Sequence, residues 1–215
     1  LIDYKKDITL LGTFLDNHDQ VRFLNVQSDL TLYQNGLIYV LNQLVYPYVF
    51  SYHATPPQIQ HGSHSPLLMK IVYYGTEQGY YGGADPNNRE SLWPNYNTTS
   101  PLYTLIRTLN TLRNTFALAH TTQQERLCTA SFYSYTRGPV FVALTNVGSL
   151  ASTFNITITD HPYSDGTQLC NIFVTNDCVT VAGGQFTISM VRGQGKVLLP
   201  TTTTSLKNPI ISVQK

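Results

Sequence analysis

The chain has 215 residues, of which 42% are hydrophobic and 12% are charged, and its formal net charge is +1. This length holds one large or two small domains, and the apolar fraction is enough to build a core. The sparse, balanced charge argues against a disordered chain and against a nucleic-acid-binding surface. No apolar run is long enough to span a membrane, and residues 1–10 do not have the layout of a signal peptide.

The first part of the chain alternates short apolar segments with helical patterns, an order typical of parallel α/β units. Residues 8–17 predict a buried strand that runs into a polar cluster. Asp29 can cap a following helix whose apolar residues recur at helical spacing. Residues 71–74 predict a second short strand. Ser100 followed by Pro101 then opens an amphipathic helix in the preferred way, with the cap before the proline.

After about residue 122 the apolar residues recur at every second position, which predicts an antiparallel sandwich or barrel. The expected strands are residues 131–136, 140–145, 153–159, 168–174, 179–182, 186–191 and 196–199. We therefore predict a first domain at residues 1–120 and a β domain with a tail at residues 121–215. Because its strands are regular and closely spaced, we expect residues 127–200 to fold without the rest of the chain.

The chain contains three cysteines. Cys170 and Cys178 flank a predicted turn, so they could form a hairpin disulfide or remain two free thiols. A disulfide would imply an oxidising compartment. Cys128 is left over, and we expect it to be a buried thiol. The glycosylation sequons at Asn97 and Asn155 agree with secretion, although such triplets are common by chance.

Residues 45–70 fit neither part of the chain, because they contain several prolines and show no clean period. Three histidines, His53, His61 and His64, raise the question of a metal site. Metal ligands are usually held by regular structure and by outer hydrogen bonds. We therefore favour an irregular loop, although a structureless stretch of this length is unusual inside an α/β unit.

Polar side chains gather where both predicted strands of the first part end, which is where α/β barrels build active sites. Paired carboxylates beside aromatic rings would suit glycoside cleavage, in which one acid protonates the leaving oxygen and a carboxylate meets the oxocarbenium-like carbon. The same residues could instead cap loops, because Asp and Asn bond their own backbone in turns. The candidate acids are Asp19, Glu77 and Asp85, and the candidate donors are His18, Arg22 and Arg89.

The stretch FLDNHDQVRF at residues 14–23 resembles the seventh-strand motif of the α-amylase family of glycoside hydrolases, in its fungal form. The stretch IVYYGTEQGYYGGADPNNRESLW is similar to the family's eighth-strand segment and the loop after it, and GQGKVLLP resembles the end of its C-terminal domain. The resemblance implies the last two βα units of a (β/α)8 barrel, followed by a Greek-key β-sandwich domain. It also implies a secreted parent enzyme that cleaves α-1,4-glucans internally with retention.

The resemblance also implies roles for single residues. Asp19 matches the aspartate that orients substrate hydroxyls and stabilises the transition state, and His18 matches a histidine that hydrogen-bonds the sugar at the cleavage point. Asp85 and Arg89 match residues that bind glucose hydroxyls in neighbouring subsites. Cys170 and Cys178 match a disulfide position of the C-terminal domain. Three further motif members are expected to support the loops, namely Asn17, Arg22 and Glu77.

The family's nucleophilic aspartate and acid/base glutamate lie on its fourth and fifth strands, and nothing in these 215 residues resembles either motif. The family's calcium site is also built upstream, so we expect calcium for the complete enzyme and no metal or other cofactor within this chain. The expected partner is an α-glucan polysaccharide. Residues 45–70 replace a Gly-x-Pro turn of the family and look like translated intron sequence or a true insertion.

These expectations describe a C-terminal piece of an α-amylase that is inactive alone, because retention needs both missing carboxyl groups. Two alternatives stay open on the sequence. One is a glucan-binding remnant that holds starch without cutting it, and the other is a gene-model product with no independent role.

Overall fold

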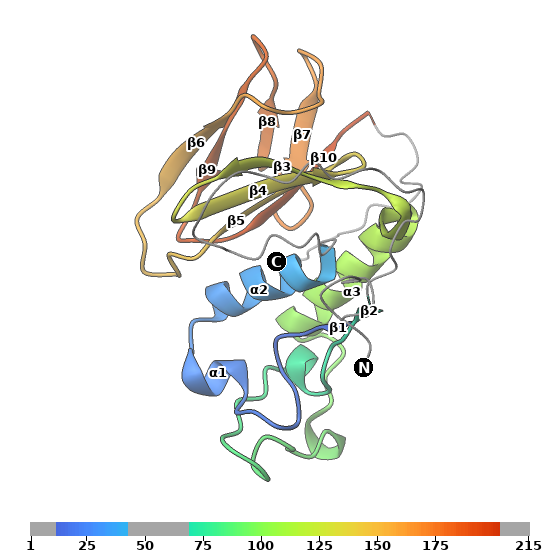
Figure 1. Cartoon of the computed structure of the whole chain (residues 1–215), viewed down its shortest axis with the longest axis vertical. Helices are drawn as coiled ribbons and strands as arrows, with labels where there is room; N and C mark the ends of the chain where they lie inside the picture. Colours follow the sequence, from blue (N-terminus) through green and yellow to red (C-terminus); the bar gives the residue numbers. More distant parts are fainter. Residues whose placement is uncertain (1–11, 43–68, 203–215) are drawn as a thin grey trace, which may run out of the picture.

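The computed structural model describes residues 12–42 and 69–202. Residues 8–11, residues 45–68 with their three histidines, and the tail beyond residue 202 lie outside the described residues, as does the choice between intron and insertion. Figure 1 shows two packed helices on one side of a stack of antiparallel sheets. The segments that follow β1 and β2 lie beyond these helices, away from the sheets (Figure 1).

The elements of the first part are β1 (Gly12–Thr13), α1 (Phe23–Val26), α2 (Leu30–Asn42), β2 (Met69–Lys70) and α3 (Pro101–Thr115), with three short 3₁₀ helices η2 (Thr76–Gln78), η3 (Trp93–Asn95) and η4 (Leu118–His120). The β domain contains β3 (Gln123–Cys128), β4 (Phe132–Arg137), β5 (Val140–Thr145), β6 (Phe154–Ile158), β7 (Gln168–Asn171), β8 (Cys178–Thr180), β9 (Phe186–Met190) and β10 (Lys196–Pro200).

The first two strands pair in parallel, with Gly12 opposite Met69 and Thr13 opposite Lys70. The parallel arrangement is confirmed, but the predicted strand at residues 71–74 is wrong, because β2 ends at Lys70. Strand β2 has only β1 as a partner in the described part of the chain, and β1 itself ends at Thr13. Because β1 supplies the hydrogen-bonding partners of β2, the pairing of β2 stops where β1 ends.

Both predicted helices are confirmed together with their caps. The Asp29 side chain accepts a hydrogen bond from the Thr31 N–H at 2.8 Å at the start of α2. The Ser100 hydroxyl accepts one from the Tyr103 N–H at 3.1 Å at the start of α3. Among the described residues, no helix has the length and apolar character needed to cross a membrane.

The β domain is antiparallel throughout, as its spacing predicted. Six strands form one sheet in the order β3-β4-β5-β10-β7-β8, and β6 pairs with β9 in a second sheet. Strand β3 was not expected. It lies at an edge of the larger sheet and is half-buried or exposed along its length. Its sequence therefore lacks the apolar alternation that identifies a strand with one buried face.

The centre of the larger sheet is buried on both faces, and β5 shows this most clearly. Val140, Val142 and Leu144 join a core cluster with the apolar sides of α2 and α3. Phe141 and Ala143 face the other way and join a second cluster with β6 and β9. One face of the larger sheet is thus covered by the helices of the first part. This burial argues against the expectation that residues 127–200 fold without the rest of the chain, which stays a prediction.

A buried asparagine of α2 fixes the helices on this sheet. The Asn35 amide donates to the carbonyls of Thr145 and Gly193 at 2.8 Å each and accepts from the Gly195 N–H at 2.8 Å. These bonds use both N–H groups and the oxygen of the Asn35 side chain, and their partners are the backbone at the end of β5 and in the loop before β10. The contact between helix and sheet thus has directional bonds as well as apolar burial.

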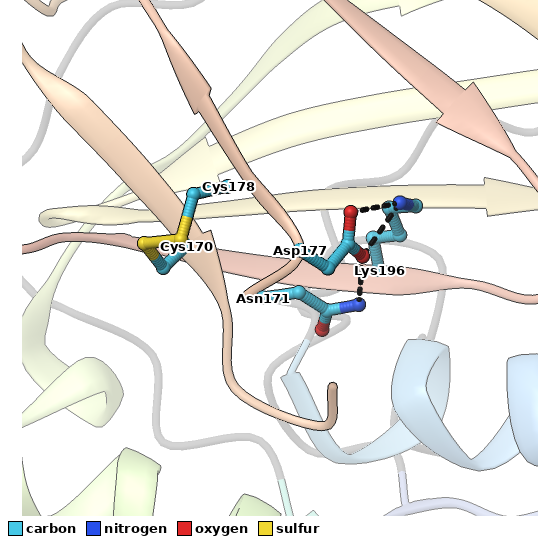
Figure 2. Close-up of a disulfide and its surroundings, with 5 residues drawn as sticks. All are labelled: Cys170, Asn171, Asp177, Cys178 and Lys196. Carbon is cyan, nitrogen blue, oxygen red and sulfur yellow. Dashed lines mark hydrogen bonds and ion pairs between the residues drawn. A yellow bond between two sulfur atoms is a disulfide. The ribbon is translucent and has the colours of Figure 1, made fainter. Parts of the chain in front are cut away.

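The Cys170–Cys178 disulfide is present and joins β7 to β8. Figure 2 shows that the hairpin end beside it is also tied to β10. The Asp177 carboxylate accepts from Asn171 Nδ2 at 2.7 Å and from Lys196 Nζ at 2.6 and 2.7 Å. A disulfide and a half-buried ion pair therefore hold the same turn.

Cys128 is exposed, so the expectation of a buried thiol is wrong. Cys128 is the last residue of the edge strand β3, and its neighbour Leu127 is the one that packs against the second core cluster. Because side chains alternate along a strand, Cys128 points to the face opposite Leu127, at a strand end that nothing covers in the described part of the chain.

Candidate functional site

The candidate residues lie on two neighbouring loops, which we call the first loop (residues 14–22, after β1) and the second loop (residues 71–92, after β2). A buried carboxylate, Asp16, anchors the first loop. Asp16 accepts hydrogen bonds from the Phe23 N–H at 2.8 Å, from Thr76 Oγ1 at 3.0 Å and from the Tyr33 hydroxyl. Burial and the carboxylate raise the pKa of Tyr33 above its usual range, so its phenol stays a donor.

Asn17 turns the chain so that the next two side chains face outward. Its Oδ1 accepts hydrogen bonds from the N–H groups of Asp19 at 2.8 Å and Gln20 at 3.0 Å. This is the local side-chain capping that the sequence left open as an alternative for the whole cluster. The side chains of His18 and Asp19 remain 63% and 69% exposed, and His18 Nε2 lies 3.3 Å from Asp19 Oδ1.

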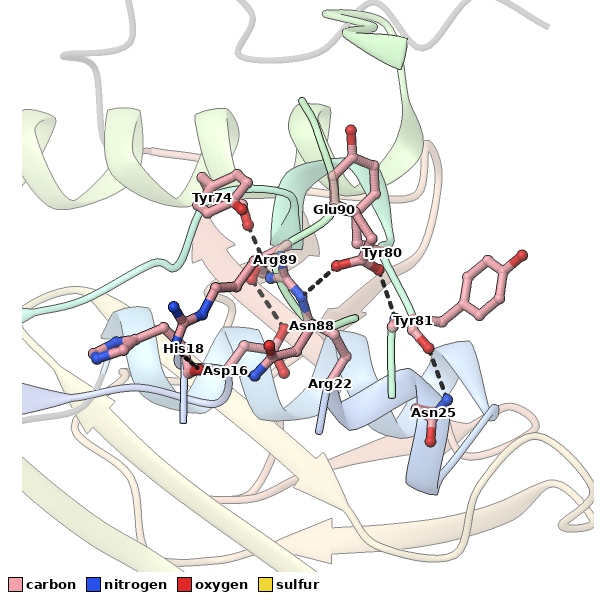
Figure 3. Close-up of polar contacts among 12 residues, drawn as sticks. Asp16, His18, Arg22, Asn25, Tyr74, Tyr80, Tyr81, Asn88, Arg89 and Glu90 are labelled. Atoms are coloured by element: carbon pink, nitrogen blue, oxygen red, sulfur yellow. Dashed lines mark hydrogen bonds and ion pairs between the residues drawn. The ribbon is translucent and has the colours of Figure 1, made fainter. Parts of the chain in front are cut away.

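The second loop contacts the first through Asn88 and Arg89. Asn88 Nδ2 donates to the carbonyls of His18 at 2.9 Å and Gln20 at 2.7 Å, and a guanidinium nitrogen of Arg89 lies 3.4 Å from the His18 carbonyl. Figure 3 shows Asn88 and Arg89 beside the stretch that carries His18. Arg89 also pairs with Asp85 at 3.0 Å, and both side chains are about half exposed. The structure therefore brings together the four residues expected to contact substrate.

Arg22 is the last residue of the first loop and is fully buried. Its Nε donates to Glu90 at 3.1 Å, a terminal nitrogen donates to the Tyr74 carbonyl at 2.8 Å, and its guanidinium carbon lies 4.2 Å from the Tyr73 ring centre. Glu90 also accepts from the Gly82 N–H. Figure 3 shows the contact between Arg22 and Glu90. This position suits the supporting role expected for Arg22, since a buried guanidinium does not reach a ligand in solvent.

Glu77 is half-buried in η2, and its carboxylate accepts only a 3.4 Å contact from Gln78 among the described residues. Its carbonyl accepts from the Ser100 hydroxyl at 2.6 Å, which ties the second loop to the start of α3. Glu77 therefore supports the loop through its backbone. The described residues contain no group of three or more His, Cys, Asp or Glu side chains that could hold a metal ion.

Three residues of this network were not predicted to have a role: Asp16, Asn88 and Glu90. Each is joined to its partners by hydrogen bonds between segments far apart in the sequence, such as Asn88 to His18 and Glu90 to Arg22. The one available signal was that a polar cluster this dense needs partners for its buried members. That signal does not identify the partners.

Both sequons are exposed. Asn97 lies before α3, and its Oδ1 accepts from the N–H and the hydroxyl of Thr99 at 2.8 and 2.7 Å. Asn155 lies on β6 opposite Ser189 of β9, with its side chain exposed. Both asparagines are therefore accessible in the described structure.

No family model matches the chain. Among curated proteins, it is 33% identical over 209 residues to "Alpha-amylase 1" of Schwanniomyces occidentalis and 32% identical over 201 residues to an α-amylase of Saccharomycopsis fibuligera. These alignments cover 93% and 90% of this chain but 36% and 35% of the two relatives. The chain thus spans about a third of the length of the curated relatives it matches.

Solved structures give the same picture. An α-amylase from Malbranchea cinnamomea superimposes with a TM-score of 0.73 and 28% identity, over 94% of this chain and 39% of that one. An α-amylase from Anoxybacillus superimposes with a TM-score of 0.66 and 25% identity, over 92% of this chain and 40% of that one.

Proposed function

Because the chain belongs to the α-amylase family of glycoside hydrolases, as the C-terminal portion of such an enzyme, we propose that it takes part in the retaining endo-hydrolysis of α-1,4-glucans such as starch and glycogen. The parallel pair of β1 and β2 with α2 and α3 supports an assignment of residues 1–120 to the last two βα units of a (β/α)8 barrel. The sheets that follow support a Greek-key β domain at residues 121–215.

Asp19 is the transition-state stabiliser in this proposal. The supporting observation is that an exposed carboxylate and imidazole, Asp19 and His18, are held next to the exposed Asp85–Arg89 pair of another strand's loop. As positive charge develops on the sugar, bonds from the Asp19 carboxylate to ring hydroxyls become stronger, which is selective binding of the transition state. His18, Asp85 and Arg89 hold glucose hydroxyls on either side.

The nucleophile and the acid/base come from the rest of the complete enzyme, since no motif of this chain resembles either. Calcium belongs to that part of the enzyme as well. We further propose that the parent is secreted and carries N-glycans at Asn97 and Asn155. The Cys170–Cys178 disulfide supports an oxidising destination, and the exposure of both sequons supports their modification.

The test is the change Asp19→Asn in the complete enzyme. It keeps the shape and removes the charge, so kcat on soluble starch should fall at least about 100-fold, the scale of one lost transition-state contact. The matched control is Asp160→Asn, because Asp160 is 64% exposed and pairs with Arg126 in the β domain. The control should leave kcat unchanged, and an Asp19→Asn enzyme with nearly full kcat would refute the proposal.

A further inference from the structure

We propose that Asn88 is a positioning residue for catalysis: its side-chain amide holds the carbonyls of the residues before and after Asp19 and so sets where the Asp19 carboxylate meets the substrate. The inference rests on the proposed function, because it assumes that Asp19 acts on the transition state.

The geometry centres on one nitrogen atom. Asn88 is fully buried, and its Nδ2 donates one hydrogen bond to the His18 carbonyl at 2.9 Å and another to the Gln20 carbonyl at 2.7 Å. These carbonyls belong to the residues immediately before and after Asp19. An amide nitrogen has two N–H groups, so both are used, and both bond the backbone of the residues next to one carboxylate.

The bonds of Asn88 complete those of Asn17. Asn17 Oδ1 accepts from the N–H groups of Asp19 and Gln20, so it restrains the same turn from its donor side. The backbone around Asp19 is thus bonded through N–H groups on one side and carbonyls on the other, while the Asp19 side chain is 69% exposed. Such restraint matters because catalytic groups on loops lose rate when they shift by a fraction of an ångström.

Stability alone does not account for an asparagine at this position. Asn88 Oδ1 is buried and has no hydrogen-bond partner among the described residues. A buried carbonyl without a partner opposes folding. The Asn88 oxygen therefore lowers the stability of the fold, whereas the Asn88 nitrogen uses both of its N–H groups on the turn at Asp19. Aspartate supplies no donor at neutral pH, and serine supplies one, so neither reproduces the pair of bonds.

The two hydrogen bonds of Asn88 also link the two loops that are proposed to hold substrate. Asn88 lies in the second loop, next to Arg89, which contacts the His18 carbonyl and pairs with Asp85 (Figure 3). The same segment of the second loop therefore supplies the proposed sugar contacts, Asp85 and Arg89, and restrains the turn at Asp19 in the first loop.

The experiment compares Asn88→Ala with Asn35→Ala in the complete enzyme. The two residues are a matched pair, because both are buried asparagines whose Nδ2 donates to two backbone carbonyls. We expect Asn88→Ala to lower kcat about 10- to 100-fold, as a misplaced catalytic group does, with little change in KM. Asn35→Ala should lower the Tm and leave the kcat of the folded enzyme within about twofold, because Asn35 lies between helix and sheet.

A double substitution shows whether Asn88 acts through Asp19. If it does, adding Asn88→Ala to an Asp19→Asn enzyme causes little further loss of kcat, because the group to be positioned is already gone. Equal multiplicative losses in both backgrounds, or a kcat loss no larger than that of Asn35→Ala, would overturn the inference. A fully active Asp19→Asn enzyme would overturn the proposed function instead.

The isosteric change Asn88→Asp guards against a misfolded alanine variant. At neutral pH the new carboxylate faces two carbonyl oxygens, and burial without donors raises its pKa. As the pH falls through that pKa, the carboxyl group gains an O–H that donates to one carbonyl. Its kcat, relative to the unchanged enzyme at each pH, should therefore rise with acidity, and a flat ratio would contradict the positioning role.

Discussion

The two loops of the site and the β domain behind them are held by different kinds of interaction. The loops follow strands of two residues each, and buried polar side chains, namely Asp16, Arg22 and Asn88, fix their path. The β domain has strands of three to six residues, and two apolar clusters hold its sheets. Hydrogen bonds are directional, whereas apolar packing depends on total buried area.

This difference has a consequence for substitutions. In the loops, one polar side chain often holds two or three backbone or side-chain groups, as Asp16 does, so its loss frees several contacts at once. In the β domain, many side chains share the burial, so single changes should be milder and loss of a whole face should be severe.

The largest effect is expected when the helices are removed. A polypeptide of residues 121–202 would expose the sheet face that α2 and α3 cover in the intact chain. At about 1.5–3 kcal/mol for each large apolar side chain, the exposed set represents on the order of 10 kcal/mol, comparable with the stability of a whole domain. The exposed residues would be Tyr135, Val140, Val142, Leu144, Val197 and Leu199.

We therefore expect this polypeptide to bind the dye ANS and to unfold in urea without a cooperative transition, unlike the chain that keeps α2 and α3. Cooperative unfolding at the midpoint of the longer chain would show that the sandwich is self-contained after all.

The next effect compares two aspartates that accept backbone N–H groups. Asp16→Ala leaves three donors without their acceptor in a buried site, and should destabilise the chain by about 3 kcal/mol or more. Asp165 accepts from Gly183 and Gly184 at an exposed turn, so Asp165→Ala should cost about 1 kcal/mol or less. Urea unfolding measures both, and equal losses would remove the distinction between buried and exposed polar contacts.

Removal of the disulfide should have an intermediate effect. The bridge closes a sequence separation of eight residues between Cys170 and Cys178. Chain-entropy arguments for a loop of this size give about 2.5 kcal/mol, so a paired change to Ala should lower the unfolding free energy by that amount. Cys128→Ser is the control, because this thiol is exposed and unpaired, and it should change stability by less than about 0.5 kcal/mol.

The smallest effect is a pH dependence at the contact between α2 and the β5–β6 turn. Hydrogen bonding from the Ser149 N–H, at 2.6 Å, is the main cause that lowers the pKa of Asp29. A carboxyl whose folded pKa is lowered stabilises the fold above its unfolded value of about 3.9, and this contribution is lost as the pH falls below that value.

The chain should therefore lose stability as the pH falls from about 4 through the lowered folded pKa of Asp29, and an Asp29→Asn variant should lose less over that range. Thermal unfolding at several pH values measures both slopes. Identical slopes for the two proteins would mean that Asp29 contributes nothing through its charge.

Local signals in the sequence predicted much of this fold. The caps Asp29 and Ser100, with apolar spacing after each, identified both long helices, and alternation identified most strands of the β domain. The end of β2, the edge strand β3 and the exposure of Cys128 were not predicted, because each depends on which neighbours a strand has in space. Which strands lie next to each other in space is not encoded in the residue pattern of a single strand.

The same limit applies to the site. The motifs indicated His18, Asp19, Asp85 and Arg89, and the structure places them on adjoining loops. Asn88 was missed, because its role comes from hydrogen bonds that span 68 and 70 residues of sequence. No spacing rule within one loop points to an asparagine that restrains another loop.

We propose that these 215 residues carry a transition-state stabiliser and sugar contacts but neither of the two carboxyl groups that make and break bonds. Reducing-sugar release from soluble starch by the 215-residue polypeptide, with and without Asp19→Asn, tests it most directly. We expect no turnover by either polypeptide, because charge stabilisation has no reaction to act on. Turnover by the unchanged polypeptide that disappears on Asp19→Asn would contradict it, since these residues would then assemble a complete catalytic site.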